Sequence, residues 1–540
     1  MCFEVKDRDL LARVGLVETK SGRFETPALL PVVNPAIQPV SPRELGQVFG
    51  FEAIITNAYI IMRHFGEKAV EEGIHEALGF DGVVATDSGA YQLLVYGKVD
   101  VGPGEVVAYQ EAIGSDIATI LDVPTGWTDS REEALRTVME TARRGEELWS
   151  LREREDVLWI GPVQGGCFTD LVALSARLMS SMPFHIHALG SPTPVMENYR
   201  FDLLVDMIMA AKLNLPPDRP FHLFGAGHPM TFALAVALGC DTFDSAAYAI
   251  YARDGRYMME DGTARLEELS YLPCSCPVCV RRDPEDLLEM PEADRIRLLA
   301  MHNLYVCLKE IRAIRQAIRE GRLWEHLAER AHAHPSLLKA FRRLAEEYHD
   351  VLEASSPTRR KKGIFIFSSP DLYRPEVVRY RRRLVERFRP GGRILLLLPY
   401  PEQKPFSRSQ EHERLLGILH SRLGDRIWEL SLCLYCLPFG LIPVELDQVH
   451  PLSQYEFSGQ EEGVLGWALE TASRFLSSRR FDAVVLLSDG SELSSSLEEA
   501  IGKLCRRGGS MFLVLREENP WSENSLSRLA EEVDGLLRPS

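Results

Sequence analysis

The chain has no long apolar run. Its longest apolar stretches, residues 393–400 and 481–488, have the length of strands and fall far below the roughly 18 residues of a membrane-spanning helix. The first residues, MCFEVKDRDLLARVG, carry charge but no apolar signal-peptide core. We therefore expect a cytoplasmic protein without a membrane partner.

Cysteine is also scarce, with 10 residues in 540, which excludes a disulfide scaffold. Positive charge is in deficit: 61 Lys and Arg stand against 78 Asp and Glu, a net charge of −17. This balance excludes a protein that coats nucleic acid through its overall charge, although a local basic patch on an acidic body stays possible. The length favours two to four domains.

A change in composition at residues 353–363, EASSPTRRKKG, follows a long charged helical segment. We predict a first domain at residues 1–352, a linker at 353–363 and a C-terminal α/β domain at 364–540. In the last domain, GIFIFS, RILLLLP, IWELSL, DAVVLLS and MFLVLR are typical of buried parallel strands with helices between them.

The first 250 residues alternate short apolar runs with helical patterns. Eight runs are candidate strands: PALLPV near residue 30, EAIITN ending at Asn57, GVVATD ending at Asp87, IATILD ending at Asp122, VLWIGPV leading to Gln164, HIHAL running into Gly190, FHLFGA leading to Gly227 and DTFD ending at Asp244. Eight regular β-α units favour a (β/α)8 TIM barrel. An open doubly wound sheet is the alternative.

Most of these strands end on a polar residue or glycine. In a barrel the carboxyl ends of the strands converge on one mouth, where active sites lie. Asp87, Asp122 and Asp244 would repel one another there, so folding alone does not favour them. Each alone is typical of a helix or turn cap, but three together, with Gln164, indicate chemistry.

The sequence Gly225-Ala-Gly227-His228-Pro lies between a strand and a helix. It lacks the spacing and the following Lys-Ser or Lys-Thr of nucleotide-binding loops, so we do not expect a nucleotide cofactor. His228 either lines the mouth or caps the helix.

Three cysteines crowd into the sequence CSCPVC, at Cys274, Cys276 and Cys279, and His302 follows after 22 residues. Thiolates and a neutral imidazole suit tetrahedral zinc, and four protein ligands close the site, so we predict one structural Zn²⁺. The alternative is three unpaired buried cysteines. Cys433 and Cys436, in contrast, lie in the apolar run LCLYCL and favour a core strand.

Seven segments together carry a resemblance to a known family. In chain order they are TDSGAYQLLVYG, LDVPT, PVQGG, MENYRF, HLFGAGHP, FDSAAYAIYARDGRY and PCSCPVC. Residues 3–345 resemble archaeal-type tRNA-guanine transglycosylases. The resemblance implies a TIM barrel with a zinc subdomain at about 271–310, a pentosyltransferase and a homodimer. Its reaction replaces guanine 15 in the D-arm of tRNA with 7-cyano-7-deazaguanine (preQ0), in archaeosine biosynthesis.

The resemblance also implies roles for individual residues. Asp244 would be the nucleophile that forms a covalent ribosyl intermediate, and Asp87 the general acid and base.

Four further residues would bind the free base, guanine or preQ0. Ser88 would help to hold the base, and Asp122 would accept hydrogen bonds from its N1–H and 2-amino edge. Gln164 would bind the carbonyl side of the base, and Gly190 would offer a backbone contact to the ring.

The chain departs from the family in places. Ala90 replaces a serine, while Tyr91 and Gln92 remain, and HALGSPTP differs around Gly190. The last residues, LAEEVDGLLRPS, give no sign of the basic RNA-binding module that archaeal members often carry. The tRNA would therefore be held elsewhere or by a separate RNA-binding chain.

Three basic clusters could hold the tRNA: Arg359-Arg360-Lys361-Lys362, the group Arg379, Arg381, Arg382 and Arg383, and the pair Arg281 and Arg282. For the first two clusters, the sequence leaves two interpretations: the side chains bind phosphates, or they form a solvated helix face. The third lies beside the zinc loop, where the resemblance implies contacts with RNA.

Residues 399–412, PYPEQKPFSRSQEH, resemble a segment of archaeosine synthase. Lys404, Pro405, Ser407, Ser409 and His412 match its pattern, but Tyr400 stands in place of the cysteine and Pro401 in place of the next serine. Two alternatives to the transglycosylase follow: a non-catalytic tRNA-binding scaffold, or a protein like archaeosine synthase that acts on preQ0-tRNA.

Overall fold

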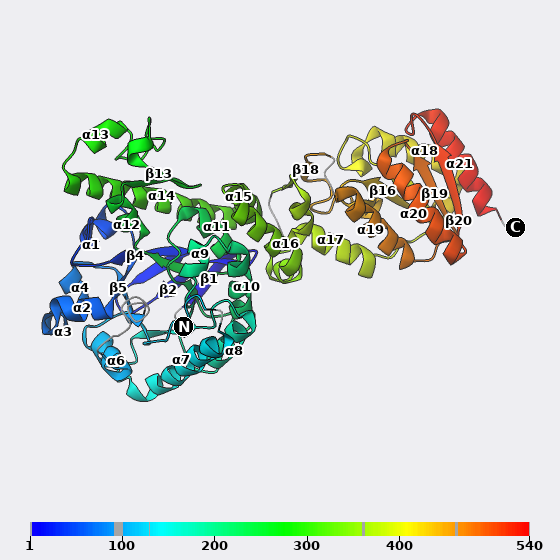
Figure 1. The fold of residues 1–540 in the computed structure, drawn as a ribbon. Coiled ribbons are helices and arrows are strands. Elements are labelled where there is room, and N and C mark those ends of the chain that lie inside the picture. Colours follow the sequence, from blue (N-terminus) through cyan, green and yellow to red (C-terminus); the bar gives the residue numbers. More distant parts are fainter. Residues whose placement is uncertain (1–2, 91–100, 129, 359–361, 460–462, 539–540) are drawn as a thin grey trace. The chain divides into compact units, whose positions relative to one another are not determined.

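The computed structural model describes residues 3–90, 101–128, 130–358, 362–459 and 463–538. The chain divides into two compact units, Met1–Leu344 with Ser355–Pro357 and Ala345–Ala354 with Thr358–Ser540 (Figure 1). The division falls within helix α16 (Pro335–Ser355), and the linker at 353–363 stays a prediction. In these described ranges, no helix is both long and apolar enough to cross a membrane.

The first unit contains a closed barrel of eight parallel strands, in the order β10-β11-β4-β5-β6-β7-β8-β9. The strands are β4 (Ala28–Val33), β5 (Ala53–Asn57), β6 (Val83–Asp87), β7 (Ile117–Thr119), β8 (Leu158–Val163), β9 (Ile186–Leu189), β10 (Phe221–Leu223) and β11 (Thr242–Ser245). Each of the eight predicted runs contributes one strand, so the TIM barrel is confirmed and the doubly wound sheet is wrong. Strand β7 ends three residues before Asp122.

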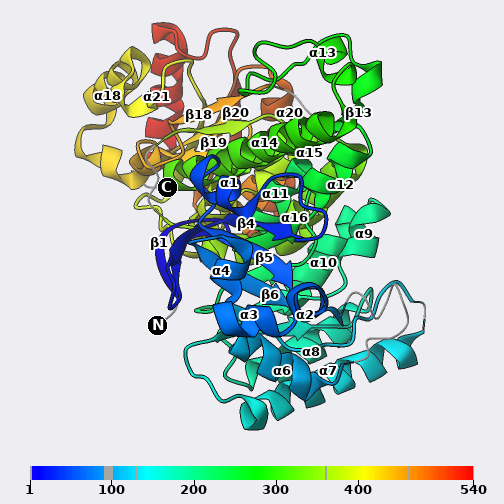
Figure 2. The same ribbon diagram turned by 90° about the vertical axis from the view of Figure 1, so that its left-hand side faces the viewer.

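Helices surround this barrel (Figure 2). They are α1 (Pro42–Gln47), α2 (Ala58–Phe65), α3 (Glu67–Glu72), α4 (Ile74–Leu78), α6 (Pro103–Ala112), α7 (Arg131–Leu151), α8 (Thr169–Ser180), α9 (Thr193–Glu197), α10 (Phe201–Lys212), α11 (Pro229–Ala237) and α12 (Ala247–Arg253). Helix α7 illustrates why they form. Ser130 caps its first turn, and Ala134, Val138 and Leu148 bury one face, as in an amphipathic surface helix.

A three-stranded antiparallel sheet precedes the barrel, which the sequence analysis missed. It consists of β1 (Phe3–Asp9), β2 (Ala12–Glu18) and β3 (Arg23–Thr26). Phe3, Val17 and Phe24 pack in one apolar cluster with inward-facing side chains of the barrel strands. Arg13 donates from Nε to Asp241, directly before β11, across 2.9 Å. The sheet therefore covers the amino-terminal end of the barrel.

A further segment follows the last barrel helix. It contains β12 (Arg256–Met258), β13 (Thr263–Arg265), the 3₁₀ turn η1 (Leu266–Glu268), α13 (Pro284–Leu288), α14 (Glu292–Glu320) and α15 (Leu323–Ala331). Asn303, buried on α14, accepts from the Met258 N–H and donates to the Tyr248 carbonyl. This buried amide joins α14 to β12 and to the barrel helix α12.

The second unit is a five-stranded sheet in the order β17-β16-β15-β19-β20. Its strands are β15 (Ile394–Pro399), β16 (Leu430–Cys436), β17 (Gly440–Pro443), β19 (Ala483–Ser488) and β20 (Met511–Arg516), and β14 (Ile364–Ile366) pairs with β18 (Tyr455–Phe457) in a separate sheet. The α-helices are α17 (Pro375–Glu386), α18 (Gln410–Leu423), α19 (Val464–Ser477), α20 (Glu492–Gly508) and α21 (Glu523–Leu537). The 3₁₀ turns are η2 (Ser369–Tyr373), η3 (Phe406–Arg408), η4 (Gly424–Glu429) and η5 (Val444–Leu446).

Four predicted strands of this unit lie parallel in one sheet, β15, β16, β19 and β20. Every residue of β15 is buried, as in a parallel sheet covered on both faces. GIFIFS, in contrast, pairs with β18 outside that sheet. Strand β17 was not predicted, and it runs antiparallel to β16. Cys433 and Cys436 lie on β16, so the core-strand interpretation of LCLYCL is confirmed.

Candidate active site

Asp87 ends strand β6 at the carboxyl mouth of the barrel. Asn57, at the end of the neighbouring strand β5, donates from Nδ2 to Oδ2 of Asp87 across 3.0 Å. Burial, together with the negative charge of Asp244, raises the pKa of Asp87 to about 6, against the hydrogen bonds that favour the ionised form. A carboxyl group with this pKa can both give and accept a proton near neutral pH.

Asp244 lies on β11 at the same mouth, with 16% of its side chain exposed. Its Oδ1 atom accepts two hydrogen bonds of 3.0 Å, from Nε2 of His222 and from the backbone N–H of Gly225. Within the described ranges, Oδ2 accepts none. One oxygen is therefore held in place, and the other is free to react.

Asp122 and Gln164 also meet at the mouth. Gln164 donates from Nε2 to Oδ2 of Asp122 across 2.5 Å, and its Oε1 atom accepts from the backbone of Thr125 and the hydroxyl of Ser191. Burial raises the pKa of Asp122 to about 7, with a further contribution from the charge of Asp87. Among the residues that the structure describes, the Gln164 amide donates no second hydrogen bond, so one hydrogen is available to a ligand.

Gly190 packs directly against Gln164. A Cβ atom at this position would lie 2.2 Å from Nε2 of Gln164, so the absence of a side chain makes room for the amide. The backbone N–H of Gly190 donates to the Val163 carbonyl across 2.8 Å. Its contact with a base ring stays a prediction.

Ser88 is fully buried next to Asp87, and its hydroxyl accepts from the N–H of Ala90 across 3.4 Å. Ala90 is buried as well. Tyr91 and Gln92 lie outside the described residues.

His222, Gly225 and the amide of Asn57 were not predicted from the sequence as neighbours of the two carboxylates. A histidine inside the apolar strand FHLF was the available signal for His222. For His228 the capping interpretation is confirmed: its Nδ1 atom accepts from the N–H of Met230, and Nε2 donates to the Gly262 carbonyl.

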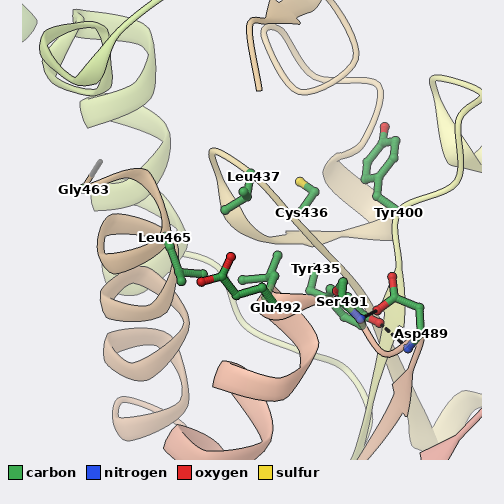
Figure 3. Close-up of a pocket in the computed structure, with 10 residues that line it drawn as sticks. Tyr400, Tyr435, Cys436, Leu437, Gly463, Leu465, Asp489, Ser491 and Glu492 are labelled. Atoms are coloured by element: carbon green, nitrogen blue, oxygen red, sulfur yellow. Dashed lines mark hydrogen bonds between the residues drawn. The ribbon is translucent and has the colours of Figure 1, made fainter. Parts of the chain in front are cut away.

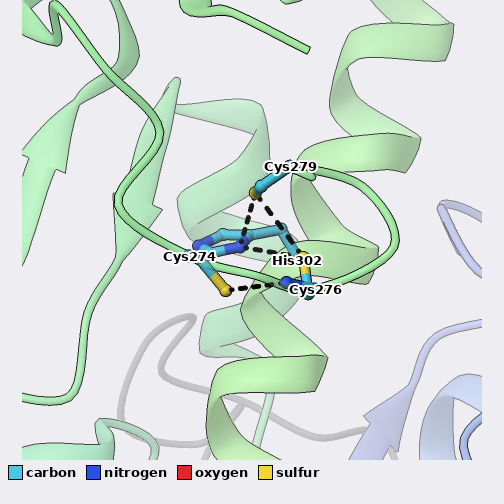
Figure 4. Close-up of side chains that lie close together, drawn as sticks. All are labelled: Cys274, Cys276, Cys279 and His302. Atoms are coloured by element: carbon cyan, nitrogen blue, oxygen red, sulfur yellow. Dashed lines mark hydrogen bonds between the residues drawn. The ribbon is translucent and has the colours of Figure 1, made fainter. Parts of the chain in front are cut away.

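The predicted metal ligands Cys274, Cys276, Cys279 and His302 lie together, with their ligand atoms within 4.8 Å of one another (Figure 4). The sulfurs of Cys276 and Cys279 are 3.5 Å apart, and Nδ1 of His302 lies 3.6 Å from the first and 3.3 Å from the second. A tetrahedral zinc with bonds of roughly 2.0–2.3 Å would separate its ligand atoms by about 3.5–3.8 Å. The group therefore fits a four-coordinate metal.

The surroundings of His302 support the same conclusion. Its Nε2 atom donates to the Met258 carbonyl across 2.9 Å, which leaves the lone pair on Nδ1, toward the sulfurs. The ring of Tyr257 stacks on the imidazole at 3.7 Å. Four protein ligands with an oriented imidazole are typical of a structural metal site.

In the second unit, three polar residues of the segment 399–412 have structural partners. Lys404 donates to the Tyr455 carbonyl across 3.0 Å and lies over that ring. Ser407 donates to Asp447 across 2.9 Å. Ser409 caps α18 through the N–H of His412. These contacts give Lys404, Ser407 and Ser409 structural roles in the second unit.

A cavity of about 500 Å³ lies at the carboxyl ends of β15, β16 and β19 (Figure 3). It is lined by Tyr400, Tyr435, Cys436, Leu437, Gly463, Leu465, Asp489, Ser491, Glu492 and Leu493. The two acidic residues lie at the N-terminus of α20, where the helix dipole favours negative charge. Oδ1 of Asp489 accepts from the N–H of Ser491, so this carboxylate also stabilises the loop before α20.

The arginines of α17 are mostly engaged within the protein. Arg379 donates from Nε to buried Glu353 across 2.7 Å, and Arg382 pairs with the same carboxylate. Arg381 lies 4.0 Å from the ring centroid of Trp467 and pairs with Glu470. The solvated-face and phosphate-binding interpretations are thus both wrong for buried Arg379 and Arg381.

The other two basic clusters differ in what can be described. Arg281 is exposed beside the metal loop, whereas Arg282 is half-buried and donates to the Val278 carbonyl. Arg359, Arg360 and Lys361 lie outside the described residues.

Comparison with known proteins gives matches along most of the chain. Residues 7–336 match the family described as queuine tRNA-ribosyltransferase (TGT), and residues 377–533 match a domain of unknown function, DUF5591. A tRNA-guanine(15) transglycosylase of Sulfolobus acidocaldarius is 40% identical over 90% of this chain and 95% of its own length.

Two further relatives carry the same name. The one from Aeropyrum pernix is 44% identical over 84% of this chain and 87% of its own length. The one from Pyrococcus abyssi is 49% identical over 71% of this chain and 65% of its own length. The chain therefore belongs to the queuine tRNA-ribosyltransferase (TGT) family, in the group of the tRNA-guanine(15) transglycosylases.

Proposed function

We propose that this protein is a pentosyltransferase that replaces guanine 15 of archaeal tRNA with preQ0, through a ribosyl ester on Asp244. The observation that carries the proposal is the pair formed by Asp244, with its free Oδ2 atom, and Asp87, whose pKa is raised to about 6. A nucleophile and a proton donor at one mouth are what base exchange requires.

In the first step, Oδ2 of Asp244 attacks C1′ of the ribose. The bond from C1′ to N9 of guanine breaks, and its electron pair leaves with the base, which takes a proton from Asp87. In the second step, preQ0 returns a proton to Asp87 and its N9 attacks C1′. The C1′–Oδ2 bond breaks, and the electron pair restores the carboxylate.

Base recognition is assigned to the other buried groups at the mouth. Asp122 would accept from N1–H and the 2-amino group, and the free hydrogen of the Gln164 amide would donate to the base carbonyl. Ser88 and Gly190 would complete the contacts to the ring. These groups suit the edge that guanine and preQ0 share, so the incoming and the departing base would occupy one site.

We assign one structural Zn²⁺ to the group formed by the three cysteines and His302. When bound, it would hold the metal loop against α14 and take no part in the exchange. By resemblance we also propose a cytoplasmic homodimer. Exposed Arg281 is a candidate RNA contact, and a separate RNA-binding chain is a candidate partner.

The test is the incorporation of radiolabelled guanine, and separately of labelled preQ0, into unmodified archaeal tRNA. Incorporation into tRNA with guanine at position 15, and none into tRNA with adenine there, is expected. The Asp244→Ala variant should fold, bind its metal and give no protein–RNA adduct on a denaturing gel. A non-catalytic scaffold would instead bind tRNA without incorporation by the wild-type protein.

A further inference from the structure

Three side chains on the adjacent strands β10 and β11 form a continuous hydrogen-bonded series. His222 and Thr242 are register partners, and Asp244 lies two residues further along β11, on the same face of the sheet. The buried imidazole bridges them: Nδ1 is 2.9 Å from Oγ1 of Thr242, and Nε2 is 3.0 Å from Oδ1 of Asp244.

The carboxylate of Asp244 sets the direction of the hydrogen bonds in this series. An ionised carboxylate only accepts hydrogen bonds, so Nε2 of His222 must donate to Asp244. With a proton on Nε2, Nδ1 offers a lone pair to the hydroxyl of Thr242, which lies 2.9 Å away. Thr242 therefore selects the tautomer in which His222 faces Asp244 with an N–H.

A second donor reaches the same oxygen. The N–H of Gly225 lies 3.0 Å from Oδ1 of Asp244. Gly225 has φ of +69°, and a Cβ atom there would lie 2.5 Å from Oγ1 of Thr193. The loop thus requires glycine where it turns its amide toward Asp244. Two donors on Oδ1 fix the carboxylate plane, and within the described residues Oδ2 accepts no hydrogen bond.

We infer that His222 is a positioning residue that aims Oδ2 of Asp244 at C1′ and assists the later release of the ribose. The inference rests on the proposed function. In the ester, Oδ1 is a neutral carbonyl oxygen; when the C1′–Oδ2 bond breaks, it becomes part of a carboxylate again. Hydrogen bonds to a charged acceptor are stronger, so both donors favour discharge of the adduct.

The experiment separates the two half-reactions in the full-length protein. The adduct is formed with unmodified tRNA, and its discharge by added guanine is followed on denaturing gels. For His222→Phe, which lacks the donor, discharge should slow by about tenfold to a hundredfold, with KM for tRNA unchanged. His222→Gln, which offers an N–H donor, should recover part of this loss.

Thr242 provides a matched pair of variants. Thr242→Val removes the hydroxyl that selects the tautomer and should slow discharge, whereas Thr242→Ser keeps the hydroxyl and should behave as the wild type. This pair decides the question if His222→Phe does not fold, as judged by metal content and thermal unfolding.

The results distinguish this inference from the proposed function. A wild-type protein that incorporates no base overturns the proposed function. A wild type that exchanges bases, with folded His222→Phe and Thr242→Val variants that discharge the adduct at the wild-type rate, overturns only the role of His222. The role of His222 would also be overturned if all four variants showed the same rise in KM for tRNA and the same fall in the discharge rate. That pattern marks a merely structural residue.

Discussion

The amide of Gln164 donates to Asp122 across 2.5 Å, although 42 residues separate them in the chain. The contact joins the end of β8 to the loop after β7 and holds a buried carboxyl group whose pKa is about 7. The ionisation of Asp122 should therefore control base binding at physiological pH.

The affinity for guanine should rise with pH up to about 7 and then level off. The carboxylate of Asp122 accepts from the base, so a protonated Asp122 must first lose its proton, and affinity should fall by about tenfold for each pH unit below 7. Calorimetric titration of free guanine between pH 5.5 and 8.5 measures this. Asp122→Asn should bind weakly and without this dependence; an unchanged pH profile in that variant would assign the titration to another group.

Gly190→Ala should weaken guanine binding by displacing Gln164. The new Cβ atom would lie 2.2 Å from the Gln164 amide, and such overpacking costs roughly 1–3 kcal/mol. Dissociation constants and unfolding midpoints measure the two effects. Gly417→Ala on α18, where no atom lies within 4 Å of the new Cβ, is the matched control. Equal guanine affinity in both variants would contradict the packing role of Gly190.

Cys276→Ser should lose the metal and lower the unfolding temperature of the first unit, because the metal loop would detach from α14. Elemental analysis of the purified protein measures bound zinc directly. Cys307→Ala is the control, since Cys307 is buried on the same helix but lies outside the ligand group. It should retain one zinc per chain. A wild-type protein without any metal would rule out the closed site.

Arg379→Ala should destabilise the second unit without changing tRNA affinity. Removal of this guanidinium leaves buried Glu353 with Arg382 as its remaining cationic partner, so the loss should be a part of the roughly 3–5 kcal/mol that a fully unpaired buried charge costs. Chemical denaturation and a tRNA binding curve are the two measurements. Arg383→Ala, at an exposed position of the same helix, should leave stability unchanged. Weaker tRNA binding by the Arg379 variant at unchanged stability would restore the phosphate-binding interpretation.

Local patterns were sufficient to predict the barrel strands and the metal ligands. Most barrel strands are short apolar runs, and the three cysteines lie within six residues. The N-terminal sheet was missed because β1 alternates buried and exposed positions and so contains no apolar run. His222 was missed because its role depends on the register between β10 and β11. The burial of Arg381 depends on Trp467, far along the chain.

The N-terminal sheet has a kinetic consequence. Because β1, β2 and β3 cover the amino-terminal end of the barrel, we expect the departing and incoming bases to pass through the same carboxyl mouth. Guanine must dissociate before the incoming base can bind, so the covalent ribosyl intermediate persists between the two half-reactions. Double-reciprocal plots against tRNA and the free base should accordingly give parallel lines.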